Sequence, residues 1–336
     1  MTARFEPKSV ERDLIAAIRR AARQEQFLEV VSAEEARARF ARRINLAPLA
    51  HETVGLSEAL GRVLAHDVRA PIDVPPFDRA NVDGFALRSA DTAGASDIAP
   101  RRLPLNGEVI VCGHAPALEV LPSSATTIAT GGMVPRGADA VVMVEYTEID
   151  GRDLRIARAV TPGSGVSFAG TDITSGETVL RRGELLTSRD TGVLAAIGVA
   201  TVDVWRKPVV AILSTGDEII APGEPMQPAK VYDSNAQVLA DAVRELGGEP
   251  TRFGITRDDL NALRTTLQSA LETCDVVLLS GGTSKGAGDL SYRVVAELRD
   301  PGIVAHGVAL KPGKPICLAA TGGRPVVVLP DRKSVV

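Results

Sequence analysis

The pattern of apolar and polar positions changes several times along the chain, and each change predicts a different kind of element. Residues 1–70 are predicted to be helical. The stretch SAEE from Ser32 is a capping-box pattern, in which the serine accepts hydrogen bonds from first-turn amides. A second helix start is predicted at Ser57, before the stretch EALGRVLAHDV.

The prolines that follow end this helical region. Pro71, Pro75 and Pro76 are incompatible with a helix interior, because proline lacks the amide hydrogen and its ring clashes with the preceding turn. Short strands with turns are predicted from here to about residue 160. Two of them are predicted to be joined by a turn at Asp150-Gly151.

From Lys207 onward, strands and helices alternate regularly. VVAILST, TRFGI and DVVLLS are predicted strands, and helices are predicted from Asn235 to Leu246, from about Asp258, and through Arg299. This order predicts a parallel sheet with helices on both faces, which binds ligands beyond the carboxyl ends of its strands. The first helix is predicted to bury one face: Val238, Leu239, Ala242, Val243 and Leu246.

Composition limits the classes of function. The chain has 336 residues, which favours two or three domains, and its net charge of −4 with 3% aromatic residues gives no general reason to bind nucleic acid. No apolar run approaches about 18 residues, so no membrane span is expected. Cys112, Cys274 and Cys317 are expected to be reduced, and a cytoplasmic location is predicted. Its 4 histidines are too sparse to indicate a His-rich zinc site, and no nucleophile triad is recognisable.

The loop SGGTSKGAGD follows the strand DVVLLS and is the first candidate site. Bare backbone amides at the mouth of a sheet suit phosphate oxygens, because no Cβ blocks their approach. The loop matches neither a Walker motif nor a dinucleotide fingerprint, and a plain glycine turn is the alternative. Asp289 closes the loop, either as a helix N-cap or as a Mg²⁺ ligand beside phosphates. The candidate loop residues are Ser280, Gly281, Gly282, Thr283 and Ser284.

Acids also follow the two preceding strands of the same predicted sheet. Asp217 and Glu218 end the first strand, and Asp258-Asp259 follow the next one. Each acid alone is more often a helix cap than a metal ligand. Because the carboxyl ends of parallel strands share one edge, acids after three strands together indicate a site.

Three further stretches offer candidate chemistry. Lys311 and Lys314 in LKPGKP lie on a proline-stiffened turn that can present two ammonium groups to an oxyanion, although two solvated surface lysines are the ordinary alternative. Asp83 lies in a rigid proline-containing segment before Gly84, where DG predicts a turn. Thr130 precedes two glycines, so its hydroxyl is either presented to a ligand or caps a turn.

Together these motifs resemble the molybdopterin molybdenumtransferase family, the molybdenum insertases that include bacterial MoeA and the E domain of gephyrin. The resemblance covers roughly residues 32–330. It implies an elongated multi-domain protomer, usually a homodimer, that hydrolyses adenylylated molybdopterin and inserts molybdate with the help of Mg²⁺. The motifs run in family order: DVPPFDRANVDGFA, IATGGMVPRGADAVVMVE, GTDITSGETVL, STGDEI, VYDSNAQVLADAVRELGGE, LLSGGTSKGAGD and LKPGKP.

The resemblance also assigns roles to matching positions. The positions that the resemblance implies to hold Mg²⁺ are Asp289, Asp258 and Glu218. The glycine loop is implied to bind the molybdopterin and nucleotide phosphates, and Lys311 with Lys314 the oxyanion. The residues matching the family's catalytic acids and hydroxyl are Asp83, Thr130, Asp172, Asp217, Glu218, Asp258 and Asp289.

The implied fold class is a multi-domain α+β and α/β protein that ends in a doubly wound α/β domain of the molybdopterin-binding type. The predicted domains are a helical extension at 1–31, an elongated linker and dimerisation domain at 32–72 plus 161–206, a β-rich inserted domain at 73–160, and the α/β domain at 207–330. Residues 331–336, DRKSVV, back-translate to a common adapter sequence, so we expect an artefactual tail in place of a C-terminal β-barrel domain.

The sequence departs from the family pattern at two basic positions. Ser167 and Phe168 stand where many members carry two arginines, and Gly307 stands where many carry Lys or Arg. Two alternatives therefore stay open beside the insertase. One is a molybdopterin adenylyltransferase, which shares the α/β domain and the glycine loop. The other is a non-catalytic pterin-binding scaffold.

Overall fold

A computed structural model describes residues 30–281, 290–310 and 314–330. The chain divides into two compact units, one of residues 1–50 with 205–336 and one of residues 51–204. The four predicted domains have other boundaries, and that finer division stays a prediction. Among the described residues, no helix combines the length and the apolar character that a bilayer crossing requires.

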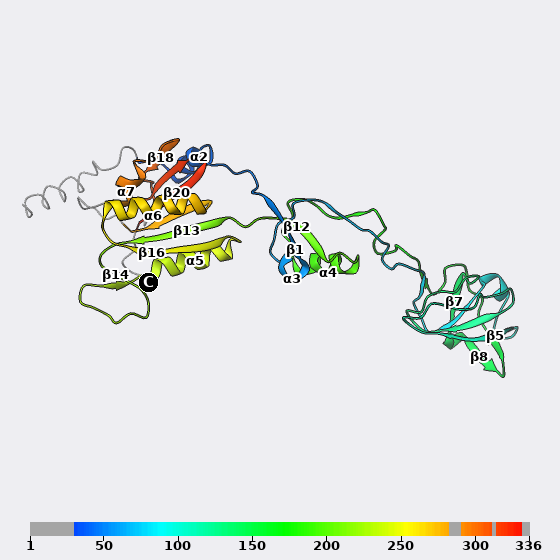
Figure 1. Cartoon of the computed structure of the whole chain (residues 1–336). Helices are drawn as coiled ribbons and strands as arrows, with labels where there is room; N and C mark the ends of the chain where they lie inside the picture. The colour runs from blue at the N-terminus through cyan, green and yellow to red at the C-terminus, as the bar shows by residue number, and fades with distance from the viewer. Residues whose placement is uncertain (1–29, 282–289, 311–313, 331–336) are drawn as a thin grey trace, which may run out of the picture. The chain divides into compact units, whose positions relative to one another are not determined.

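The unit of residues 1–50 and 205–336, here the α/β unit, is built on one sheet of six strands (Figure 1). Four neighbouring strands are parallel, and the last two form an antiparallel edge. The predicted parallel sheet is therefore confirmed for four strands, and the sheet as a whole is mixed. In sheet order the strands are β16 (Glu249–Thr256), β13 (Val209–Thr215), β17 (Val276–Ser280), β20 (Arg324–Leu329), β19 (Cys317–Thr321) and β18 (Pro301–His306).

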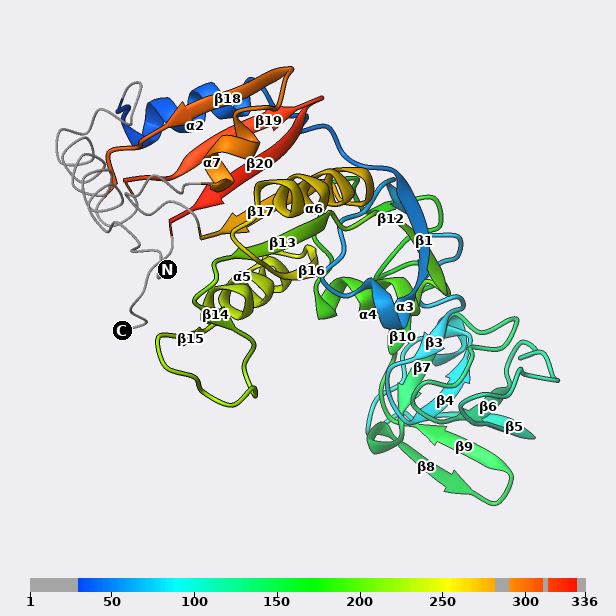
Figure 2. The same cartoon turned by 60° about the vertical axis from the view of Figure 1, so that its left-hand side comes forward.

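Helices cover both faces of this sheet, as its alternating side chains require. Ala211 and Leu213 of β13 join one core with α6 (Leu260–Thr273) and α7 (Leu290–Val295). The alternate residues Val210 and Ile212 are also buried, and α5 (Ser234–Glu245) packs along β13 and β16 on that other face (Figure 2). The short helix α2 (Ala33–Ala41) packs on β18 and β19 through a small apolar cluster around Ala36 and Ala305.

Several predicted helices are shorter than expected. The prediction of helix over residues 1–70 is confirmed for Ala33–Ala41 and wrong for residues 42–70, which contain only the four-residue helix α3 (Leu56–Ala59) together with strands. The helix predicted to run through Arg299 ends at Val295. Ser32 does cap α2, accepting a hydrogen bond from the Glu35 amide at 3.1 Å.

The predicted apolar face of α5 is partly wrong. Ala240 and Val243 are buried against the sheet, whereas Val238 is 59% exposed and Leu246 is 88% exposed. The helix turns about 100° per residue, so Val238 lies too far round the helix to join the stripe through Leu239, Ala240 and Val243. Leu246 is in phase with this stripe, but it is the C-cap residue beyond the last helical residue, Glu245. The helix ends at Glu245, one residue before the predicted end at Leu246.

The unit of residues 51–204, here the β unit, contains a second six-stranded sheet. Its last two strands turn at Gly151, which has φ +67°, so the predicted hairpin is confirmed. In sheet order the strands are β7 (Ala140–Met143), β4 (Gly84–Leu87), β6 (Ala125–Ile128), β5 (Arg101–Ile110), β9 (Asp153–Ile156) and β8 (Thr147–Asp150).

The rest of the β unit is held by two-stranded pairs around a separate apolar core. This core includes Val54, Leu64, Leu186 and Val204, and the helix α4 (Ser188–Ala196) contributes Leu194. The strand pairs around this core are β1 (His51–Gly55) with β12 (Thr201–Trp205) and β2 (Val68–Arg69) with β11 (Thr178–Leu180). A third pair, β3 (Arg79–Ala80) with β10 (Val166–Ser167), packs instead in the cluster that contains residues of β4, β5, β6 and β7.

Candidate functional site

A cavity of about 700 Å³ lies at the carboxyl edge of the sheet in the α/β unit. The edge is formed where β13 and β16 end, and the short parallel pair β14 (Ile219–Ile220) and β15 (Val231–Tyr232) adds one wall. This is the edge at which a parallel sheet is expected to bind its ligand. The charged residues that line the cavity are Asp217, Glu224, Lys230, Arg257, Asp258 and Asp259.

Two predicted acids meet in this cavity. The Asp258 amide donates to Asp217 Oδ1 at 3.3 Å, and the Thr215 hydroxyl donates to Asp258 Oδ1 at 3.3 Å. Both carboxyl groups belong to exposed residues, so oxygen atoms of both are available to a ligand. Asp259 has a structural task instead: it caps α6 by accepting from the Ala262 amide at 2.7 Å.

Two basic residues of the cavity were missed by the sequence analysis. Lys230 is half-buried and donates from Nζ to the backbone oxygen of Asp217. Arg257 is exposed and immediately precedes Asp258. The position of Arg257 directly after a predicted strand could have been recognised from sequence. Lys230 could not, because it reaches the cavity only through the pairing of β14 with β15.

The start of the glycine loop lies at the same edge. Ser280 is buried and accepts a hydrogen bond from Asn235 Nδ2 at 2.9 Å. Gly281 has φ +104°, and a Cβ there would lie 2.3 Å from the backbone oxygen of Thr215, so only glycine fits. The remaining predicted loop residues lie outside the described part of the chain: Gly282, Thr283, Ser284 and Asp289.

A second cavity, of about 290 Å³, adjoins Ser280 and is mostly apolar. Asn235 and Ser280 are its polar residues, and their side chains bond to each other. The edge of the sheet therefore carries a charged cavity and an apolar one, which suits a ligand with both charged and apolar parts. The apolar lining comes from Val238, Leu239, Leu310, Ile316, Leu329 and Pro330.

Glu218 and Lys314 are the other predicted site residues of the α/β unit that the structure describes. Glu218 is half-buried, and its carboxyl group lies against Gly216; it does not line the charged cavity as Asp217 does. Lys314 is half-buried in the turn before β19, and its backbone oxygen accepts from the Val308 amide at 2.9 Å. Lys311 lies outside the described residues.

Three predicted site residues belong to the β unit, and two of them are in contact. Asp83 Oδ1 accepts from the Thr130 amide at 2.7 Å and from the Thr130 hydroxyl at 2.9 Å. These two hydrogen bonds hold the pKa of the Asp83 carboxyl below its usual value, because they favour the charged form. Asp172 is exposed, and its amide donates to the Val74 oxygen at 2.9 Å.

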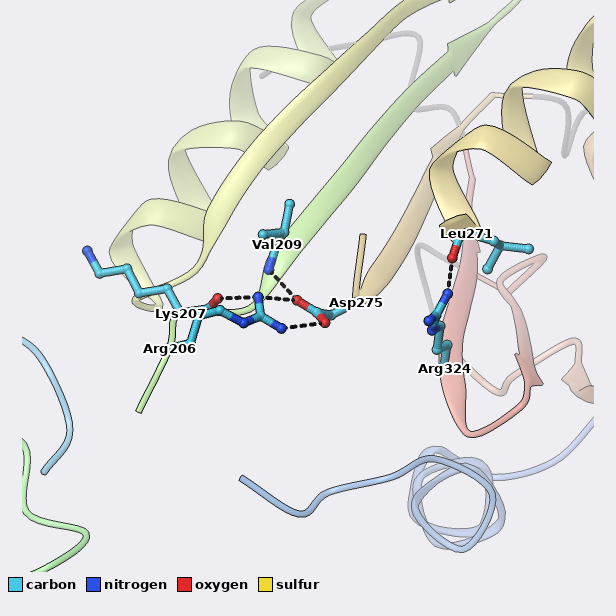
Figure 3. A network of polar contacts seen from close by, with 6 residues as sticks. All are labelled: Arg206, Lys207, Val209, Leu271, Asp275 and Arg324. Atoms are coloured by element: carbon cyan, nitrogen blue, oxygen red, sulfur yellow. Dashed lines mark hydrogen bonds and ion pairs between the residues drawn. The ribbon is translucent and has the colours of Figure 1, made fainter. Parts of the chain in front are cut away.

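The opposite edge of the α/β sheet carries a polar network with a structural role (Figure 3). The Arg206 guanidinium donates twice to Asp275, at 2.9 Å each, and the Val209 amide donates to the same carboxylate at 2.8 Å. Hydrogen bonding by Arg206 lowers the pKa of Asp275. Because Val209 begins β13 and Asp275 precedes β17, this carboxylate joins the starts of two neighbouring strands.

Two family comparisons cover most of the chain. Residues 31–198 match the family described as MoeA N-terminal region (domain I and II), and residues 211–334 match the one described as a probable molybdopterin binding domain. The chain belongs to the MoeA family. It is therefore a member of the molybdopterin molybdenumtransferase family of molybdenum cofactor biosynthesis.

Individual relatives agree with this assignment. Molybdopterin molybdenumtransferase 2 of Mycobacterium tuberculosis is 38% identical over 286 residues, which are 83% of this chain and 69% of the relative. The molybdopterin molybdenumtransferase of Bacillus subtilis is 36% identical over 269 residues, which are 78% of this chain and 61% of the relative. The chain thus spans between three fifths and seven tenths of the length of these two relatives.

Solved structures show the same fold. Two crystal structures of a molybdopterin biosynthesis MoeA protein from Pyrococcus horikoshii align with TM-scores of 0.79 and 0.76, at 39% and 33% sequence identity. The alignments cover 90% and 91% of this chain and 75% of each of those chains. The predicted fold class is therefore confirmed for the part of the fold that this chain contains.

Proposed function

We propose that this chain binds adenylylated molybdopterin and takes part in its Mg²⁺-assisted hydrolysis, with insertion of molybdate and release of AMP. The observation that carries the proposal is the charged cavity at the carboxyl edge of β13 and β16. Acids and bases lie side by side there, as a ligand that carries both phosphates and a divalent cation requires. Family membership and the likeness to MoeA structures support the same assignment.

The donor set of the cavity fits Mg²⁺. Asp217 and Asp258 offer exposed carboxylate oxygens, and Mg²⁺ favours one or two carboxylates together with water and phosphate oxygens. We propose that these two residues hold the ion together with Asp289, and that Glu218 supports them from beside Gly216. Bound Mg²⁺ would supply Lewis-acid polarisation of the phosphoanhydride.

The basic residues of the cavity offer positive charge for the phosphate groups of the substrate. We propose that Lys230 and Arg257 bind phosphate oxygens of the substrate, since both line the cavity beside the acids. The Lys230 ammonium is already oriented, because it donates to the backbone oxygen of Asp217. Lys314 and Lys311 are proposed to bind molybdate.

The apolar cavity is proposed to receive a flat ring of the substrate. Its lining combines aliphatic side chains with the amide of Asn235 and the hydroxyl of Ser280, which fix the orientation of a heteroaromatic ring by hydrogen bonds.

In the β unit, Asp83 and Thr130 form a preorganised pair. We propose that Asp83 acts as a permanent anion at neutral pH, because both Thr130 hydrogen bonds favour its ionised form. Its second carboxylate oxygen is then an acceptor for substrate or water. Asp172, exposed in the loop after β10, is proposed as a further acid of the same reaction.

The cavity assignment is tested by binding of AMP to the full chain, with and without Mg²⁺, by isothermal titration calorimetry. We expect binding that depends on Mg²⁺. Asp258→Asn and Arg257→Gln should each weaken it about tenfold or more, because each removes a charged partner worth about 1.5–3 kcal/mol. Asp241→Asn is the matched control, since Asp241 is an exposed acid of α5 outside the cavity.

Two outcomes count against the assignment. If AMP binds with the same affinity with and without Mg²⁺, the proposed metal role is wrong. If both variants bind AMP as the parent chain does, the assignment of the cavity is wrong. The reaction is tested separately by release of AMP from adenylylated molybdopterin. Release of AMP that depends on molybdate supports the insertase, formation of adenylylated molybdopterin and pyrophosphate from molybdopterin and ATP supports an adenylyltransferase, and binding without either reaction supports a scaffold.

A further inference from the structure

Two histidines and an aspartate meet in the β unit, and none of the three has been assigned a role above. His51 begins β1, His66 follows the segment that bridges to β12, and Asp203 lies within β12. Each offers one ligand atom, a ring nitrogen or a carboxylate oxygen, and these atoms all lie within 4.8 Å of one another. All three residues belong to the unit of residues 51–204.

The backbone around this cluster is fixed by pairing. β1 pairs with β12, and the Leu56 amide donates to the Ala200 oxygen at 3.1 Å. On the other side of β12, Leu64 bridges Val204, and the Ala65 amide donates to the Asp203 oxygen at 2.9 Å. The three ligand residues are therefore presented by three adjacent segments.

The cluster lies on the outer face of these segments. Val202 and Val204 of β12 are buried in the apolar core, so Asp203 between them points the other way. Val54 of β1 is buried in the same core, and the alternate residues Thr53 and His51 are exposed. The apolar side chains of β1 and β12 are therefore packed in the core, and the polar atoms of the cluster face solvent.

Contacts within the cluster already orient its members. The Thr53 hydroxyl donates to Asp203 Oδ1 at 2.6 Å, which fixes the carboxylate and leaves Oδ2 for another partner. The two imidazole rings meet edge to face, with centroids 5.2 Å apart and an angle of 74° between their planes. A hydroxyl bonded to a ligating carboxylate is the kind of outer contact that orients ligands at metal sites.

We propose that His51, His66 and Asp203 form a binding site for one divalent transition-metal ion of the Zn²⁺ type. Two imidazoles and one carboxylate are a donor set that suits Zn²⁺, Co²⁺, Ni²⁺ or Cu²⁺, whereas Mg²⁺ prefers oxygen ligands alone. The site is thus chemically distinct from the acidic cavity. Three protein ligands leave at least one coordination position for water or an external ligand.

The distances permit closure on an ion. Two ligand atoms about 2.1 Å from one tetrahedral metal ion lie about 3.4 Å apart. The three ligand atoms, which lie within 4.8 Å of one another, therefore have to approach by no more than about 1.4 Å, which rotations of the exposed His51 and His66 side chains provide. The bound ion ties β1, β12 and the segment before His66 together, and so it stabilises this part of the β unit.

Titration of the metal-stripped full chain with Co²⁺ and Zn²⁺ tests the site, in excess Mg²⁺ so that acidic sites are filled. We expect one Co²⁺ per chain with visible absorption bands of a low-symmetry site, displacement by Zn²⁺, and a rise in melting temperature. His51→Gln and His66→Gln should each weaken Co²⁺ binding at least about tenfold. His114→Gln, an exposed histidine elsewhere in the same unit, should bind as the parent does.

Two further variants test the role of the Asp203 carboxylate. Asp203→Asn should weaken binding, and Thr53→Val should weaken it less, because Thr53 orients the carboxylate without offering a ligand atom. Circular dichroism of each metal-free variant checks that it folds. Failure of the parent chain to bind Co²⁺ overturns the site, and so does binding that survives in both histidine variants.

Discussion

Asp275→Asn tests how the neighbouring strands β13 and β17 of the α/β unit are joined at their starts. The change keeps the size of the side chain but removes its charge, so it leaves the Arg206 guanidinium without its anion and weakens the bond from the Val209 amide. Hydrogen bonds to a charged group contribute about 1.5–3 kcal/mol when one partner is removed. Arg206 is 37% exposed and Asp275 26%, so water recovers part of this energy. We expect a loss of about 1.5–2.5 kcal/mol in the free energy of unfolding.

The assay is urea unfolding at pH 7, followed by circular dichroism and by fluorescence of Trp205, the single tryptophan. The matched control is Asp241→Asn, which breaks an exposed pair with Arg244 on the surface of α5 and should cost less than about 1 kcal/mol. Equal losses of unfolding free energy in the two variants would refute the reasoning. They would show that the partly buried, bidentate ion pair stabilises the chain no more than an exposed pair does.

The pH dependence of the same variant checks the sign of the effect. Arg206 lowers the pKa of Asp275 in the folded chain, so folding favours the ionised form. The stabilisation is therefore present above the ordinary aspartate pKa of about 3.9 and is lost as the pH falls through the folded value. We expect the gap between the parent and the Asp275→Asn variant to close below about pH 4. A gap that stays constant down to pH 3 would contradict an ionic origin.

Two further predictions rest on single positions. Gly281→Ala should lower the free energy of unfolding by about 3 kcal/mol or more, because the added Cβ would lie 2.3 Å from the Thr215 oxygen. Gly254→Ala is the control, also at positive φ but in open space, and it should cost only about 1 kcal/mol in the same urea assay. Cys112 is exposed while the other two thiols are buried, so one thiol per native chain should react rapidly with a disulfide reagent and Cys112→Ser should abolish that fast phase. Equal costs for the two glycines, or a fast phase that survives in the serine variant, would contradict these structural arguments.

The carboxyl edge of the α/β sheet was predicted well from sequence. Buried strands such as VVAILST are continuous apolar runs, and the residue after each strand end is then fixed at the edge. Asp217 and Asp258 were found in this way, and the structure brings them into hydrogen-bonding contact. Gly281 was predicted from its lack of a Cβ, and the close approach of Thr215 supplies the physical reason.

Other residues could not be found by local reasoning. Lys230 reaches the charged cavity because β14 pairs with β15, which no periodicity indicates. The four histidines looked too sparse for a metal site, yet the fold brings His51 and His66 together beside Asp203. Residues 51–55 were predicted to be helical, but they form β1, because β12 supplies a strand partner from far along the chain.

The sequence by itself determined the local elements of this protein: the buried strands and main helices of the α/β unit, the hairpin turn at Gly151, and the cap at Ser32. Each depends on residues within a few positions of one another, so spacing and side-chain type suffice. Tertiary structure decided which distant side chains meet. Thr53 and Asp203, 150 residues apart, bond only because two strands pair across the β unit. Hydrogen bonding between strands places no constraint on their separation in sequence, and such contacts become visible only in the folded chain.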